Sequence, residues 1–212
     1  MTDIPERPPH FECRSFRASV PDARYLASKT GRDLKDRKPL KLTDTVIRRV
    51  QPPHDWQTSY DDYGTLNSCG APRGTGNASI WFERTALPVE GDLVTWTKNT
   101  LSAPAHHLSL QDLQTLQRLL RAVDSESDTI DSAQTFDIDK ERVIETKGRS
   151  TGPAERPHEV WRFQNIYRAL EIPGKGMYLQ TNSYIGESTA FLKHQREADE
   201  CFQSIEWTLD YR

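Results

Sequence analysis

Cys69 is the residue of this chain whose type and surroundings come closest to those of a catalytic nucleophile. It lies in the segment NSCGAPRGTG (67–76), among small residues that favour turns, and the nearby cation Arg73 would favour its thiolate. A nucleophilic cysteine also requires a base, and none of the six histidines stands at a recognised spacing from it. We therefore expect an ordinary loop cysteine, and we keep a small enzyme or ligand-binding domain centred on the Cys69 loop as the alternative.

Three other patterns resemble ligand sites but lack a residue that each site requires. The glycines that follow Cys69 are not followed by the lysine of a phosphate-binding loop, and they precede a strand instead of a helix. The adjacent His106 and His107 have no third ligand at a suitable spacing. The acidic segment that begins at Asp124 has Thr129 where a calcium loop has its glycine and Thr135 where the loop has its last glutamate. We expect no catalytic residue, no metal and no cofactor.

Aromatic and acidic side chains gather in the segment 51–77, which also holds three prolines and four glycines. The prolines and glycines predict a long loop inserted into the domain, and loops of this length are usually functional or mobile. Rigid aromatic residues beside charges are typical of the anchors of a protein interface. We predict that partner-binding residues lie here, namely Trp56, Tyr60, Asp61, Asp62 and Tyr63.

The segment HEVWRFQNIYRALEI (158–172) supplies two further candidates for partner binding, Trp161 and Arg162. Its aromatic residues alternate with Arg162, Gln164 and Arg168, as in a strand whose two faces differ. Either one face of this strand is an open binding surface, or the aromatic residues complete the core on both sides of a covered sheet. The sequence supports both interpretations.

Composition restricts the class of protein. The chain has 212 residues, so we expect one domain, 1–212, with a sizeable core. A net charge of −3 argues against nucleic acid as a partner, and no apolar run is long enough to insert into a membrane. The three cysteines form no disulfide pattern, and the N-terminus lacks the apolar stretch of a secretory signal. We therefore expect a cytoplasmic protein.

The periodicity of apolar residues predicts the elements that position these side chains. The clearest helix is 109–123, which Ser109 caps with Asp112 three residues later, and the clearest turn is PGKG (173–176) between two strands. Expected strands are 11–20, 42–50, 78–87, 134–138, 142–147, 158–172 and 177–185. Two further helices are expected, one with Asp92 as its N-cap and one over 187–205. Strands and helices occur in runs, which indicates an α+β domain with a mostly antiparallel sheet flanked by helices.

Four segments carry a resemblance to a known family: SFRASVPD (15–22), ASIWFERTALPVEGDL (78–93), GKGMYLQTNSY (174–184) and CFQSIEW (201–207). In their order and local sequence they resemble the family that includes the photosystem II extrinsic protein PsbP, the bacterial DcrB-type proteins and the effector-associated chaperones of type VI secretion. The resemblance implies a PsbP-like fold, an antiparallel sheet flanked by helices. It also implies a protein that acts mainly by binding other proteins.

These observations predict a non-catalytic protein-binding module, an accessory of a bacterial secretion system. Its partner would be an effector, for which it acts as chaperone or adaptor, or a toxin, which it neutralises as an immunity protein. The two roles stay open, as does a homodimer.

Overall fold

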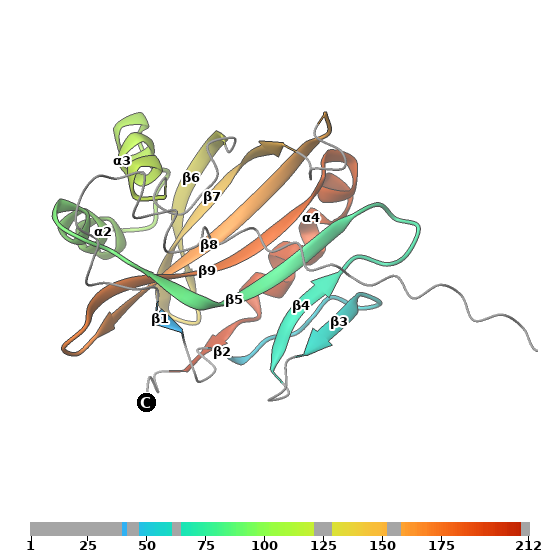
Figure 1. Cartoon of the computed structure of the whole chain (residues 1–212), viewed down its shortest axis with the longest axis horizontal. Helices are drawn as coiled ribbons and strands as arrows, with labels where there is room; N and C mark the ends of the chain where they lie inside the picture. The colour runs from blue at the N-terminus through green and yellow to red at the C-terminus, as the bar shows by residue number, and fades with distance from the viewer. Residues whose placement is uncertain (1–39, 42–46, 61–64, 121–128, 152–157, 209–212) are drawn as a thin grey trace, which may run out of the picture.

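The computed structural model describes residues 40–41, 47–60, 65–120, 129–151 and 158–208 (Figure 1). The expected strand 11–20 lies outside these residues. The main sheet has the strand order β3-β4-β5-β9-β8-β7-β6, and each of these pairings is antiparallel. The bounds are β3 Gln57–Tyr60, β4 Leu66–Gly70, β5 Ala78–Pro88, β6 Thr129–Ile138, β7 Glu141–Thr151, β8 Val160–Ile172 and β9 Gly176–Glu187.

Two shorter pieces complete the strands. β1 (Leu40–Lys41) pairs with the second half of β5, and β2 (Ile47–Arg49) pairs with β10 (Glu206–Trp207) in a separate ribbon. The described residues thus form an antiparallel sheet with helices packed on it, which confirms the predicted α+β class. Among them, no helix is long and apolar enough to cross a membrane.

The helices α2 (Asp92–Ser102), α3 (Leu110–Leu120) and α4 (Ser188–Gln203) cover opposite faces of the sheet. Ile166 packs in the cluster that contains α4, whereas its neighbour Tyr167 packs in the cluster that contains α2 and α3. Successive residues of a strand point to opposite faces, so the two clusters lie on opposite sides. Figure 1 shows α2 and α3 together at one end of the sheet.

The structure confirms the expected N-terminal cap of α3 but not that of α2. For α3, Ser109 Oγ accepts a hydrogen bond from Asp112 N over 3.2 Å, and Asp112 Oδ2 accepts one from Ser109 N over 3.2 Å, as in a capping box. For α2, the expected cap Asp92 is the first helical residue, and Gly91 takes the N-cap position without a side-chain bond. The Asp92 carboxylate is instead paired with Arg118 of α3, over 3.2 Å.

The last hairpin and the last helix follow the prediction. β8 and β9 pair continuously from Trp161↔Glu187 to Ile172↔Gly176, and both Gly174 and Gly176 of the turn have positive φ. The buried residues of α4 form the predicted apolar face. They are Ala190, Phe191, His194, Ala198, Cys201 and Phe202.

The segment 51–77 is not the structureless loop that its prolines and glycines predict. It contains β3 and β4, which form a hairpin at one side of the main sheet (Figure 1). β4 pairs with β5 through Ser68↔Trp81, Cys69↔Ile80 and Gly70↔Ser79. The segment therefore extends the sheet through the four residues of β3 and the five of β4.

Candidate partner-binding edge of the sheet

Strand β3 forms one lateral edge of the main sheet, and all four of its residues are exposed. Tyr60, at its end, has 56% of its surface exposed. On its inner side β3 pairs with β4, for example Gln57↔Gly70 and Ser59↔Ser68. Within the described residues, no strand pairs with its outer side.

The hydrogen-bond register shows which backbone groups β3 turns outward. Ala71 N donates to Ala78 O over 2.9 Å between β4 and β5, and backbone groups alternate in direction along an antiparallel strand. Cys69 therefore turns its N–H and C=O toward β5, and its neighbours in β4 turn theirs toward β3. Because Thr58 lies opposite Cys69, the N–H and C=O of Thr58 point away from β4, into solvent.

The other lateral edge of the sheet, β6, is covered at its middle, over residues 133–135. The segment 106–108 runs along it: Leu108 N donates to Ala133 O over 2.9 Å, and Thr135 N donates to His106 O over 2.8 Å. Edge strands of natural proteins are covered in this way, or they carry lysine or proline, which discourages pairing with another chain. β3 has the sequence QTSY and neither of these residues. Within the described sheet, the β6 edge is thus interrupted at its middle by a covering segment, whereas the whole length of the β3 edge is uncovered.

Trp56 fixes the start of β3 to helix α4. It is 6% exposed, and its indole Nε1 donates to Glu197 Oε2 over 3.3 Å. Its ring meets the His194 ring edge to face, with centroids 5.5 Å apart. We expected Trp56 to contact a partner, but the structure places its ring inside the domain. Its observed role is to hold the strand that carries the open edge.

The loop 71–77 between β4 and β5 is also held on α4. His194 Nε2 lies 2.9 Å from Thr75 Oγ1. Gly76 has a φ of 98°, and a Cβ at this position would lie 2.7 Å from the Cβ of Ala190, so a larger residue would push the loop off the helix. The position of the β3–β4 hairpin therefore depends on α4 at both ends of the hairpin.

Thr75, His194 and Glu197 have the order of a hydroxyl–imidazole–carboxylate triad. His194 Nδ1 lies 2.5 Å from Glu197 Oε2, and its Nε2 faces the Thr75 hydroxyl. A catalytic hydroxyl passes its proton to the imidazole, but the Thr75 hydroxyl donates to Pro72 O over 2.7 Å. Because the backbone already accepts the Thr75 hydroxyl proton, this hydroxyl is not arranged to pass it to His194. The three side chains instead hold the loop 71–77 on helix α4.

Cys69, the candidate nucleophile, lies in the core. Its exposed fraction is 0%, and burial raises the pKa of its thiol to about 12. The same cause raises the pKa of the neighbouring thiol, Cys201. A thiol of this kind carries almost no thiolate at neutral pH and is inert. The interpretation of the Cys69 loop as an enzyme site thereby loses the local feature on which it rested.

The remaining predicted contacts do not form one surface. Trp161 is 6% exposed, and Arg162 is half-buried on the opposite face of β8. The aromatic side chains of β8 thus belong to the interior, which is the second of the two interpretations offered above. Asp61, Asp62 and Tyr63 lie outside the described residues. Tyr60 is the predicted contact that the structure places on the open edge.

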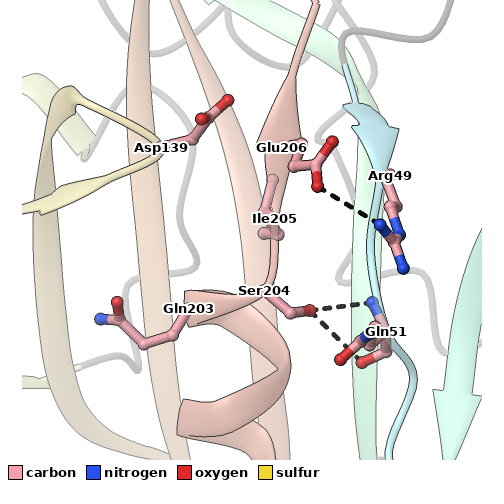
Figure 2. A pocket seen from close by; sticks show the side chains of 7 residues that line it. All are labelled: Arg49, Gln51, Asp139, Gln203, Ser204, Ile205 and Glu206. Carbon is pink, nitrogen blue, oxygen red and sulfur yellow. Dashed lines mark hydrogen bonds and ion pairs between the residues drawn. The ribbon is translucent and has the colours of Figure 1, made fainter.

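One surface pocket, of about 300 Å³, lies where β2, β10, the end of α4 and the β6–β7 turn meet (Figure 2). Gln51 N donates to Ser204 Oγ over 2.8 Å, and Arg49 pairs with Glu206 over 3.7 Å. These contacts join β2 to the chain that follows α4. The pocket therefore lies at the junction of two segments, and four of its lining residues bond to one another in the pairs Gln51–Ser204 and Arg49–Glu206.

A second pocket, of about 270 Å³, lies between α4 and strands β6 to β8. Gln164 Nε2 donates to Glu145 Oε1 over 2.6 Å and to Asp199 Oδ1 over 2.8 Å, and Gln134 Nε2 donates to Glu145 Oε2 over 2.7 Å. Buried polar groups are tolerated when they are paired in this way. The network ties α4 to the sheet, because Asp199 belongs to the helix and Gln134, Glu145 and Gln164 to the strands.

Sequence reasoning missed the residue that defines the open edge, Thr58. The signal was present but weak: QTSY and LNSCG flank the Asp61-Asp62 pair as two short polar runs, and short polar strands are hard to separate from loops by alternation alone. Which strand lies at the edge depends on the order of the strands in the sheet, and a local sequence pattern does not predict that order.

No family model and no curated protein matches this chain. Among solved structures, it is similar to the crystal structure of LpqN, which is involved in cell envelope biogenesis of Mycobacterium tuberculosis. The superposition covers 81% of this chain and 90% of LpqN, with a TM-score of 0.46 and 6% sequence identity. At this level of similarity, function has to be argued from the residues of this chain.

Proposed function

We propose that this chain is a non-catalytic protein-binding module whose partner adds a strand along β3. The contrast between the two lateral edges carries the proposal: the segment 106–108 covers the middle of β6, whereas Thr58, in the middle of β3, presents its N–H and C=O to solvent. Strand addition obtains affinity from main-chain hydrogen bonds and specificity from side chains at alternate positions. Tyr60, exposed at the end of β3, supplies an aromatic anchor beside them.

The β3–β4 hairpin is held rigidly on α4, which favours strand addition. Trp56 and Thr75 attach the two ends of the β3–β4 hairpin to α4 through Glu197 and His194. An edge held in place before binding loses less conformational entropy when a partner docks on it. The observed clamps therefore support a preformed binding strand.

The biological setting that we propose comes from the sequence resemblance. We place the chain with the PsbP-like and DcrB-like proteins, as a cytoplasmic accessory of a bacterial secretion system. The partner is then an effector or a toxin. An immunity protein inhibits the activity of its purified toxin, whereas a chaperone raises the soluble yield of its effector and leaves the activity unchanged. An activity assay with and without this chain separates the two roles.

Replacing Thr58 tests strand addition directly. Thr58→Pro removes the outward N–H and fills its place with the proline ring, while the bonds of Gln57 and Ser59 to β4 stay intact. Thr58→Val is the matched control, because it keeps the N–H and the β-branched shape. We expect Thr58→Pro to lose the partner that wild type and Thr58→Val recover from the native host, with affinities measured on the purified complexes.

The folded state of each variant is checked by near-ultraviolet circular dichroism, since Trp56 and Tyr184 lie close together in the core. Wild-type affinity in a correctly folded Thr58→Pro variant would show that the partner binds elsewhere. A loss of affinity in Thr58→Val as well would show that the Thr58 side chain, and not the backbone, is the contact.

A further inference from the structure

We infer that the start of β8 and the adjoining side of α4 form a second docking surface, which binds a protein segment that carries an aspartate or glutamate beside an apolar side chain. Arg162, Val160 and Leu192 define this surface. It is separate from the edge strand, because β4, β5 and β9 lie between β3 and β8 in the sheet. The inference therefore goes beyond strand addition and does not depend on it.

Arg162 lies beside a second arginine, and one carboxylate serves the pair. Arg149 stands directly opposite Arg162 in the β7–β8 ladder. Both side chains lie on the face on which α4 packs, because Gln164, two residues further along β8, bonds to Asp199 of the helix. Like charges directly opposite each other destabilise the pairing of two strands. The Asp131 carboxylate neutralises Arg149 through hydrogen bonds of 2.8 to 3.2 Å.

The Arg162 guanidinium is left without a counter-ion. Among the described residues, its side chain forms no hydrogen bond or ion pair, and its Nε is buried without a partner. Glu145, on the same face, already accepts bonds from two glutamines and pairs with Lys147 over 3.4 Å. A guanidinium presents its N–H donors in a planar fork that fits a carboxylate through two parallel bonds. A carboxylate of another molecule would satisfy these donors.

Two exposed apolar side chains border Arg162. Val160 lies two residues before it on the same face of β8, roughly 7 Å away along the strand, and is 55% exposed. The Ser188 hydroxyl donates to Val160 O over 2.8 Å, so the first turn of α4 lies against the start of β8. Leu192, which is 62% exposed, follows one turn later on the same side of the helix. Half of the four large apolar side chains that are exposed in the described residues thus lie beside an unpaired arginine.

The chemistry of the surface determines its occupant. The charge of Arg162 selects an acidic group, and Val160 and Leu192 supply apolar area that is removed from water on docking. A second copy of this chain is a poor occupant, because pairing the surface with itself around a two-fold axis would bring the two Arg162 side chains together. The expected motif is an aspartate or glutamate next to leucine, isoleucine or valine.

Two blocked peptides that match in shape and differ in charge test the inference, acetyl-Leu-Asp-Leu-amide and acetyl-Leu-Asn-Leu-amide. Binding to the full chain is followed by nuclear magnetic resonance, through the Nε–H signal of Arg162 and the methyl signals of Val160 and Leu192. We expect the Asp peptide to shift these signals and to bind about tenfold more tightly than the Asn peptide, as expected for a hydrogen bond between charged groups. Leu192→Ser should weaken the binding of both peptides.

Arg162→Met keeps the aliphatic stem and removes the charge, so it should lose the preference for the Asp peptide. The matched control is Arg73→Met, at an exposed arginine of the loop 71–77, and it should bind like wild type. In the absence of peptide, Arg162→Met should not lower the free energy of unfolding, because it removes the repulsion between Arg162 and Arg149. A clear loss would show that a carboxylate of this chain already pairs with Arg162, and it would overturn the inference.

Equal affinity for the two peptides, an Arg162 signal that does not move, or an unchanged preference in Arg162→Met would each overturn the inference as well. So would a dimer, seen by sedimentation, that Arg162→Met dissociates. Thr58→Pro should bind the Asp peptide like wild type, and a loss of binding in this variant would place the peptide on β3 instead. The proposed function is tested separately, by the binding of the native partner to Thr58→Pro.

Discussion

At the scale of residues, the candidate binding group is the backbone of Thr58 and not a reactive side chain. Cys69 and Thr58 lie opposite each other in neighbouring strands, yet their surroundings differ completely. Cys69 is buried under α4 with its thiol neutral, and Thr58 is exposed with its N–H and C=O free of the β4 ladder. A local sequence pattern suggested reactivity at Cys69, but packing by residues far along the chain decides it.

The buried thiols should be unreactive in the folded protein. Burial raises the pKa of Cys69 to about 12, so the thiolate stays scarce even at pH 9, where an ordinary thiol of pKa 9.0 is half ionised. We expect iodoacetamide to modify Cys69 and Cys201 only after denaturant is added. Peptide mapping by mass spectrometry reports each site. Rapid modification of Cys69 at pH 7 in the folded protein would restore the enzyme interpretation.

Trp56 and Tyr60 should behave differently on replacement, because one is buried and the other is exposed. Trp56→Ala leaves a cavity against His194 and Tyr184 and should lower the free energy of unfolding by about 3 kcal/mol or more. Tyr60→Ala should change it by less than about 0.5 kcal/mol. Urea denaturation measures both values. Similar losses for the two variants would contradict the assignment of Trp56 to the core and Tyr60 to the surface.

At the scale of elements, the parts that local chemistry specifies were predicted well. Helix α3 begins where Ser109 and Asp112 can cap each other, and the β8–β9 hairpin turns where Gly174 and Gly176 accept positive φ. The N-cap of α2 was misplaced by one residue: Gly91 takes this position without a side-chain bond, and Asp92, the expected cap, is the first helical residue and pairs with Arg118.

The β3–β4 hairpin was missed for a physical reason. Gly70 and the polar residues of both strands give little alternation, and β4 is buried chiefly through Cys69. What makes these residues a strand is pairing with β5, whose partner β9 lies about a hundred residues further along the chain. Tertiary context of this kind overrides weak local preference.

Ser109 should stabilise α3 through its cap. The Ser109 hydroxyl and the Trp96 indole donate to Asp112 and hold the pKa of that carboxyl below its ordinary value. Ser109→Ala should lower the free energy of unfolding by about 1 kcal/mol. Gln114→Ala, at an exposed position of the same helix, is the control and should have little effect. Thermal unfolding compares the two, and equal midpoints would contradict the cap.

At the scale of the whole molecule, the sheet is covered selectively. α4 packs on one face, α2 and α3 pack on the other, and the segment 106–108 covers the middle of the β6 edge. β3 is the lateral edge that is uncovered along its whole length within the described sheet, and another strand can continue the ladder there. The clamps from α4 hold this edge in place.

The amide exchange rate of Thr58, measured by nuclear magnetic resonance in the free protein and in complex with its native partner, tests this account most directly. In the free protein the Thr58 N–H points into solvent and should exchange rapidly, whereas those of Gln57 and Ser59 are bonded to β4. Strand addition predicts strong protection of Thr58 in the complex, with little change at Gln57 and Ser59. An unchanged exchange rate at Thr58 in a saturated complex would contradict binding through β3.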